Sequence, residues 1–146
     1  MQIPIHRIVE ALGGEKVIKR PIRQEFDLLD VVREGLPMES AAFLQKNLGL
    51  TNKTMSHILA ISESTYQRRI RANAKLTPDE SEKTISLSEV YELGMDVFED
   101  KQDFEEWLES RVTALQNKRP VDFLDSMLGR KQVLNILNAI QHGIFS

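Results

Sequence analysis

The chain has 146 residues, no cysteine and a formal net charge of −3, with 41% apolar and 28% charged residues. This length suits one compact domain, or two small ones that share a core. The absence of cysteine excludes a disulfide framework, thiol catalysis and thiolate metal sites, and it fits a cytoplasmic protein without requiring that location. No apolar run approaches the roughly 20 residues that span a bilayer, and residues 1–12 lack the features of a signal peptide. We therefore expect no membrane association.

Charge is unevenly distributed along the chain. Residues 51–76 hold five basic and one acidic side chains, whereas residues 77–110 hold two basic and twelve acidic ones. DNA phosphate attracts the first segment and repels the second. We therefore expect the acidic segment to face away from DNA, towards water or a partner protein.

The first 50 residues are expected to form three helices. Apolar residues recur at helical spacing near the N-terminus, at Ile5, Ile8, Val9 and Leu12. This pattern predicts a short amphipathic helix that the Gly13-Gly14 pair ends. Residues 16–22 alternate only weakly and contain a proline, so we expect an extended connector or at most an edge strand. Two helices follow, over about residues 27–34 and over about residues 37–48.

Residues 51–73 have the pattern of two short helices joined by a tight turn. Thr51 or Asn52 can cap the first helix, and Ser62 can cap a second one over about residues 63–71. A small residue, Ala60, lies where the chain must turn between the two helices. The segment is therefore interpreted as a helix-turn-helix.

The second helix of this motif divides into two faces. Tyr66 and Ile70 point to one side, and a polar row points to the other. Arginine can read guanine and glutamine can read adenine in the major groove, although a charged helix face is often simply solvated. The two caps, the small residue and the polar row together favour DNA binding. The residues expected at the DNA are Thr51, Asn52, Lys53, Ser62, Ser64, Thr65, Gln67, Arg68 and Arg71.

Two further helices are expected after the motif. Residues 77–80 combine a cap, a proline at the first helical position and an acid at the third, which is a strong start signal. The long helix that follows, to Phe98, shows one apolar stripe, and its other faces carry acidic charge. Asp100 can cap the next helix, which contains Trp107. That tryptophan is expected first as a core anchor, with a role at a partner interface as the alternative.

The last segment ends on an apolar pair. Arg119-Pro120 predicts a further turn of helix, and Ser126 can cap a final helix that Gly143 ends. Ile144 and Phe145 then stand where a chain end is normally polar. We expect them to dock on this domain or on another molecule.

The sequence shows no constellation that indicates catalysis. No glycine-rich phosphate loop follows a strand, and His6, His57 and His142 lie far apart without metal-ligand spacing. Ser56 and His57 are neighbours on a helix, so their side chains point about 100° apart. We therefore expect no enzyme, no cofactor and no metal.

Two stretches of the chain resemble a known family. Residues 35–98 are similar to the Xre-like DNA-binding half of the Xre/MbcA/ParS antitoxins. Residues 103–146 resemble the toxin-binding domain of the same family, through Trp107-Leu108, Arg119-Pro120 with Leu124, and the ending from Ile140 to Phe145. This ending is more specific than a helix-turn-helix pattern. The family often has a Gly-Ala pair before the last helix, where this chain has Met-Leu-Gly-Arg-Lys over residues 127–131. The resemblance therefore does not predict which contacts that loop makes.

The resemblance implies an all-α fold, in which an Xre-like helix-turn-helix bundle precedes a small helical toxin-binding domain. The expected division is an N-terminal helical segment (1–35), a DNA-binding domain (36–76), a connecting helix (77–98) and a toxin-binding domain (99–146). The implied partner is a RES-domain toxin that consumes NAD, with the antitoxin tail obstructing its active site. The residues expected at the toxin are Trp107, Arg119, Asn138, Gln141, His142, Ile144, Phe145 and Ser146.

The resemblance also implies that the other half binds the promoter of its own operon, as double-stranded DNA, in the form of a homodimer. Two alternatives remain at this point. The chain can be a stand-alone transcriptional repressor whose C-terminal part only dimerises, or a pure inhibitor with a vestigial DNA-binding motif. The sequence does not locate the dimer surface, for which residues 5–12 are one candidate.

Overall fold

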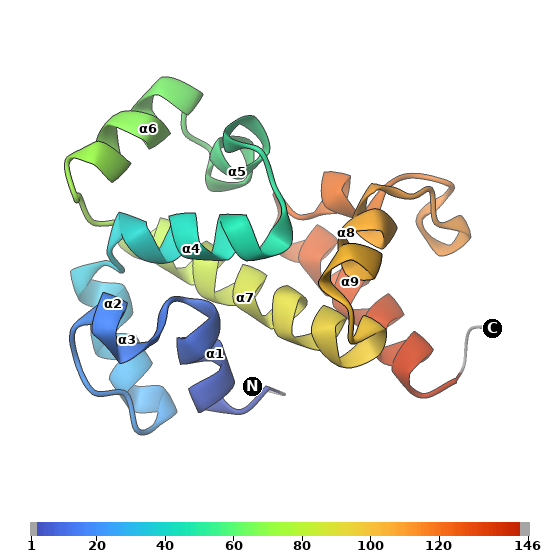
Figure 1. Ribbon diagram of the computed structural model, residues 1–146, viewed down its shortest axis with the longest axis horizontal. Coiled ribbons are helices and arrows are strands. Elements are labelled where there is room, and N and C mark those ends of the chain that lie inside the picture. The colour runs from blue at the N-terminus through green and yellow to red at the C-terminus, as the bar shows by residue number, and fades with distance from the viewer. Residues whose placement is uncertain (1–2, 144–146) are drawn as a thin grey trace.

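The computed structural model describes residues 3–143, in which helices pack around one long central helix, α7 (Pro78–Phe98) (Figure 1). These residues form nine α-helices and two short 3-10 helices, with no sheet, as the sequence predicts. The other elements are α1 (Ile5–Ala11), α2 (Gly14–Ile18), α3 (Glu25–Glu34), α4 (Met38–Leu48), α5 (Asn52–Leu59), α6 (Glu63–Arg71), α8 (Lys101–Glu109), η1 (Thr113–Leu115), η2 (Pro120–Phe123) and α9 (Met127–Gln141).

Five helices begin at the capping residues that the sequence predicts. In each case a side-chain oxygen accepts a hydrogen bond from a backbone N–H of the first turn, which would otherwise have no partner. At the start of α7 the bond is reciprocal, because the Glu80 carboxylate also accepts from the Thr77 N–H. The five capping residues are Thr51, Ser62, Thr77, Asp100 and Ser126.

The expectation of an extended segment over residues 16–22 is wrong for residues 16–18, which belong to α2, whereas residues 19–22 lie outside any helix. The chain forms α2 immediately after α1, because Gly13 takes a φ of 101° and redirects the backbone into a new helix. A β-carbon at Gly13 would overlap the Val17 side chain, so glycine is required at this turn. Ile18 and Ile22 are both buried, which places the segment against the core.

Helix α7 buries more of its surface than the single predicted stripe. It contacts α1, α3, α4, α5, α8 and α9, so most of its faces are covered. The hydropathy pattern misses this because several of the buried residues carry small hydroxyl groups, whose hydrogen bonds are made internally. Ser81 Oγ accepts from the Leu36 N–H at 2.9 Å, and Thr84 Oγ1 donates to the Glu80 carbonyl at 2.8 Å.

The acidic segment is partly neutralised within the chain. Arg7 on α1 lies 2.8 Å from both Glu92 and Asp96 on α7, and these hydrogen bonds raise the pKa of Arg7. Glu80 pairs with Arg69 at 2.7 Å. The expectation that this segment faces water or a partner is therefore wrong for Glu80 and Glu92, which are half-buried, whereas Asp96 remains exposed.

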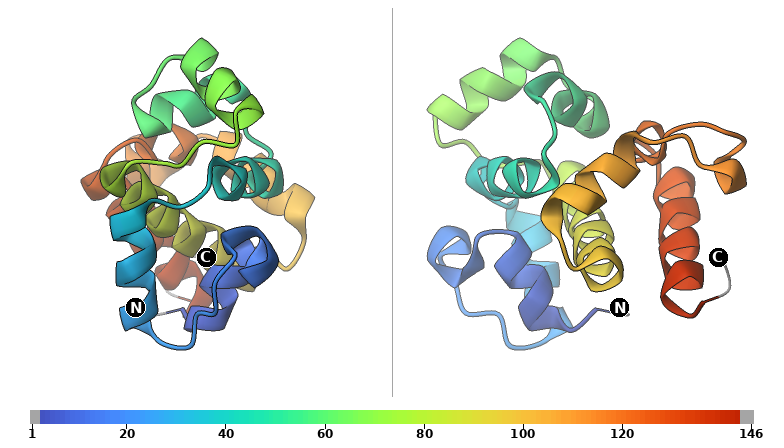
Figure 2. Two further views of the ribbon diagram at one scale, coloured as in Figure 1. Left: turned by 90° about the vertical axis from the view of Figure 1, so that its left-hand side faces the viewer. Right: turned by 45° about the vertical axis from the view of Figure 1, so that its right-hand side comes forward.

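The two ends of the helix-turn-helix region are fastened to each other. The Leu76 N–H donates to the Leu36 carbonyl at 2.7 Å, and the Met38 N–H donates to the Ala74 carbonyl at 2.9 Å. One apolar core then continues from α1 to α9. Figure 2 shows α5 and α6 at one end of the molecule in both views, with the C-terminal helices to one side of α7. Across residues 3–143, every helix is too short or too polar to cross a bilayer.

Candidate functional site

Helices α5 and α6 form the predicted helix-turn-helix. Ala60 ends α5 with a φ of 61°, and its N–H donates to the His57 carbonyl at 3.0 Å. The next N–H, of Ile61, donates to the Ser56 carbonyl at 3.0 Å, so the turn closes the end of α5. Ile61 is partly buried and packs against the core at the corner between the two helices.

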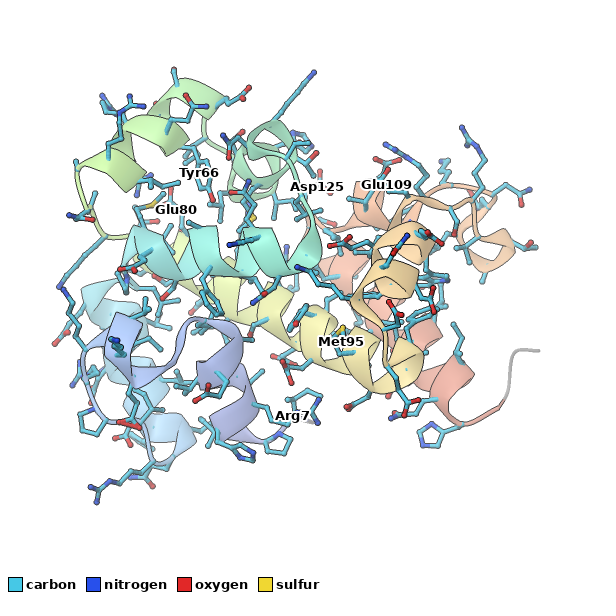
Figure 3. All side chains as sticks on the ribbon, viewed as in Figure 1. Arg7, Tyr66, Glu80, Met95, Glu109 and Asp125 are labelled. Atoms are coloured by element: carbon cyan, nitrogen blue, oxygen red, sulfur yellow. The ribbon has the colours of Figure 1, made fainter. Side chains whose placement is uncertain are left out.

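Tyr66 anchors α6 to the rest of the protein. Its side chain is fully buried, and its hydroxyl donates to Gln45 Oε1 on α4 at 2.6 Å. Figure 3 shows Tyr66 beneath α6, on the side that faces α4. Burial raises the pKa of the Tyr66 phenol. Gln45 Nε2 in turn donates to the Leu50 carbonyl at 3.0 Å and to Asn52 Oδ1 at 2.8 Å, so the side chain of Asn52 is engaged within the protein.

Arg69 holds the other end of α6 against α7. Its guanidinium donates to both carboxylate oxygens of Glu80, at 2.7 and 3.2 Å, and to the Lys75 carbonyl at 3.0 Å. Burial on its own would raise the pKa of Glu80, but hydrogen bonds from Arg69 and Thr77 outweigh burial and hold this pKa below its usual value. Arg69 therefore holds α6 in position and does not belong to the outward polar row of that helix.

This ion pair makes stability depend on pH. The folded-state pKa of Glu80 lies below the unfolded value of about 4.3, so the pair stabilises the fold at neutral pH and is lost as pH falls through the lower value. Glu80→Gln is expected to lower the free energy of unfolding at pH 7 by about 1–3 kcal/mol, and by less in acid. Urea unfolding at pH 7 and near pH 3 measures the difference. Glu39→Gln, at an exposed position on α4, is the control; an equal loss at both pH values would contradict the assignment.

The outward row of α6 is available for binding. Ser64, Arg68 and Arg71 are exposed and Gln67 is half-buried. Within residues 3–143, neither Arg68 nor Arg71 makes an ion pair, so both charges remain uncompensated. Two of the predicted residues serve the cap instead: Ser62 Oγ accepts from the Thr65 N–H at 3.1 Å and donates to Thr65 Oγ1 at 2.8 Å.

The second candidate surface lies around α8 and η2. Trp107 is half-buried in an aromatic cluster, with ring centroids 5.5 Å from Phe98 and 6.2 Å from Phe104. This contact supports its expected role as a core anchor and leaves part of the indole at the surface. Arg119 pairs with Glu109 at 2.6 Å and with Asp122 at 2.9 Å, which raises the pKa of Arg119.

Helix α9 carries the remaining predicted residues towards the end of the chain. Val133 and Leu137 face the core, whereas Asn138 is half-buried. Gln141 and His142 are exposed, and His142 Nδ1 lies 2.8 Å from the Asn138 carbonyl. The remaining three predicted toxin contacts, Ile144, Phe145 and Ser146, lie outside the described residues.

Sequence reasoning missed a buried arginine at the start of α9. Arg130 is only 5% exposed; its Nε donates to Ser86 Oγ on α7 and its Nη1 to the Leu124 carbonyl, both at 2.9 Å. Burial lowers the pKa of Arg130. No signal marks it, because a lone arginine in a helix is normally solvated. Arg130 fixes α9 to α7, against which α5 of the helix-turn-helix also packs.

One contact joins the two candidate surfaces directly. His57 Nε2 on α5 lies 3.3 Å from Asp125 Oδ2, in the loop before α9. Among residues 3–143, no three histidine or carboxylate side chains are grouped so that they could hold a metal ion.

Comparison with known proteins identifies both halves of the chain. Residues 27–88 match the model of the antitoxin Xre-like helix-turn-helix domain, and residues 93–143 match that of the antitoxin Xre/MbcA/ParS C-terminal toxin-binding domain. The two matched ranges together cover most of the chain.

Individual relatives agree with these domain matches. The chain is 28% identical to the antitoxin Xre of Photorhabdus laumondii, over 80% of this chain and 79% of that one. It is 26% identical to the Prs ADP-ribosylating antitoxin of a Sphingobium species, over 82% and 81%. Its fold resembles a chain in the crystal structure of the M. tuberculosis MbcT–MbcA toxin–antitoxin complex, with a TM-score of 0.58 and 20% identity, over 75% of this chain and 96% of that chain.

Proposed function

Because the chain belongs to the Xre/MbcA/ParS antitoxin family, we propose that it neutralises a cognate toxin through its C-terminal part and represses its own operon through α5 and α6. The observation that carries the proposal is the toxin-binding domain matched over residues 93–143. That domain corresponds here to α8, η2 and α9. Helices α8 and α9 pack on α7, η2 packs on α8 and α9, and side chains at the end of α9 are exposed. The protein acts by binding in both roles.

The proposed toxin is a RES-domain enzyme that consumes NAD. One relative is named for ADP-ribosylation, a reaction that uses NAD, and the MbcT–MbcA match is a toxin–antitoxin complex. Helix α9 ends at Gln141, and residues 144–146 follow it closely in the sequence. We place those residues in the active site of the toxin, where an apolar pair at a chain end has a partner to bind.

Deleting residues 144–146 tests the toxin-binding half. We expect binding to the toxin encoded by the neighbouring gene to weaken at least about tenfold, since two buried apolar side chains are each worth about 1.5–3 kcal/mol. Calorimetric titration and an NAD-consumption assay measure the loss. Gln132→Ala, at an exposed position on α9 before the tail, is the control and should bind normally. Undiminished neutralisation by the shortened chain would contradict a role for the tail.

Arg68→Ala combined with Arg71→Ala tests the DNA-binding half. Affinity for the operon's own promoter should fall about tenfold to a hundredfold. The plot of log affinity against log salt concentration should become less steep, by the amount expected for the loss of up to about two phosphate contacts. A fluorescence-anisotropy titration at several salt concentrations measures both quantities. The control removes two exposed basic side chains elsewhere, Arg111→Ala with Lys118→Ala. Equal losses from the two pairs would indicate a general charge effect and not a recognition helix.

We further propose that two copies bind the operator together. A two-fold dimer places its recognition helices about 34 Å apart, one turn of DNA, and so matches a palindromic site. Such a dimer requires a self-complementary surface that leaves both copies of α6 facing the same way.

A further inference from the structure

Two neighbouring residues at the start of α9 expose large apolar side chains. Met127 is 76% exposed and Leu128 is 70% exposed. Single apolar side chains at a surface are ordinary, but a group of them normally marks a contact surface. The other large apolar residues exposed among residues 3–143 are Phe26, Leu29 and Phe43, on α3 and α4. Met127 and Leu128 are therefore the ones that fall within residues 93–143, the matched toxin-binding domain.

The turn that carries Met127 and Leu128 is firmly held. Ser126 Oγ accepts from the Gly129 N–H at 3.0 Å and so caps the helix. The next residue, Arg130, is buried and donates to Ser86 Oγ on α7 and to the Leu124 carbonyl. The two exposed side chains thus project from a backbone that is already fixed in the free chain. A partner that binds there does not have to order this turn first, which lowers the entropic cost of binding.

One side of α9 connects this turn to the far end of the helix. Exposed or half-buried residues recur along it at spacings of four and three: Met127, Lys131, Leu134, Asn138 and Gln141. Residues at these spacings lie on the same side of a helix. In the right-hand view of Figure 2, α9 lies at the edge of the molecule. The surface beside Met127 is therefore continuous with the toxin contacts proposed at Asn138 and Gln141.

A hollow adjoins Met127 on the side of the helix-turn-helix. Met127 lines it together with Ala60, at the turn between α5 and α6, and Ser86 on α7. An exposed apolar side chain beside a hollow offers a partner a group to enclose and a space for a side chain of its own. Close packing of this kind is typical of the residues that contribute most to binding at an interface.

We propose that Met127 and Leu128 form a second anchor for the toxin, separate from the C-terminal tail. Helix α9 has 15 residues, so at about 1.5 Å per residue its two ends lie about 20 Å apart. The toxin then lies along the exposed side of α9 and is held by apolar side chains at both ends of the helix. This inference deepens the proposed neutralisation of a toxin and rests on it.

Met127→Glu combined with Leu128→Glu tests this anchor. Both side chains are exposed and lie in the first turn of α9, where the helix dipole favours a carboxylate, so the variant should stay folded. Calorimetric titration of the full chain with the purified RES-domain toxin of the neighbouring gene measures affinity. The dissociation constant should rise at least about a hundredfold, because two charges replace two apolar side chains that the toxin buries. Thermal melts followed by circular dichroism check the fold.

Three further variants serve as controls. Phe26→Glu with Phe43→Glu adds the same charge at exposed apolar positions outside residues 93–143 and should leave the affinity unchanged. Met127→Leu with Leu128→Met keeps the apolar surface and should also bind the toxin normally. Gln132→Ala, one turn beyond Leu128, should bind normally because a polar side chain at the rim of an interface contributes little.

Deleting residues 144–146 in the same background separates the two anchors. Because the anchors are far apart, their effects on affinity should multiply when both are removed. A double-glutamate variant that binds the toxin as tightly as the unchanged chain would overturn the second anchor and leave the proposed neutralisation standing. Failure of the unchanged chain to bind the toxin would overturn both. If the variant altered only self-association, measured by sedimentation equilibrium without toxin, a second copy would occupy this surface and the proposal would fail.

Discussion

Replacing Tyr66 with alanine is expected to lower the free energy of unfolding by about 3–5 kcal/mol, the usual cost of removing a large buried aromatic side chain. Tyr66 is fully buried between α6 and α4. Its loss leaves a cavity under the recognition helix and removes the partner of Gln45 Oε1. Since small domains are stable by only about 5–15 kcal/mol, this change removes a large part of the total. Urea unfolding followed by circular dichroism measures it, and promoter binding should be lost with it.

Tyr66→Phe separates packing from hydrogen bonding at the same position. The ring stays, and only the bond from the hydroxyl to Gln45 is lost, so the expected cost is about 1–2 kcal/mol. Gln45 also orients Asn52 at the start of α5, which makes a small loss of promoter affinity part of the expectation. A phenylalanine variant as unstable as the alanine variant would show that packing contributes little here.

Gly129→Ala is expected to destabilise the protein by about 3 kcal/mol, at the upper end of the range for overpacked sites. A β-carbon at Gly129 would fall on the backbone carbonyl oxygen of Phe123, and backbone cannot rotate away as a side chain can. The first turn of α9 would have to move, which also disturbs the Arg130 hydrogen bonds to α7. Toxin binding should weaken in parallel.

Lys131→Ala is the matched control for this substitution, because it lies two residues further along α9 and is exposed. Thermal melts and urea unfolding of the two variants measure the effect, and the lysine variant should stay within about 0.5 kcal/mol of the unchanged chain. Equal stability of the two variants would mean that α9 can shift without cost.

Local signals made much of this fold predictable. Thr51, Ser62, Thr77, Asp100 and Ser126 each cap the helix that follows, because the oxygen that binds a free N–H belongs to a residue next to it in the sequence. The helix-turn-helix follows from such signals, together with the two faces of α6. The same reasoning fails at Gly13, where a glycine that was expected to end one helix also begins the next.

Contacts between distant residues could not be predicted. Arg7 and Asp96 are 89 positions apart, and Arg130 and Ser86 are 44 apart, so neither pair leaves a periodic pattern. Small hydroxyl residues were read as polar surface on α7, although Ser81 is buried with its hydrogen bond satisfied.

The central position of α7 has a consequence for synthesis of the protein. Its partners include α1, at the start of the chain, and α9, near its end, so the apolar core is complete only when residues up to Leu137 are present. Chains are made at about 5–20 residues per second, and contacts that span a whole sequence form late in folding. Each newly made molecule therefore completes the core beneath both proposed binding surfaces only after α9 has been made.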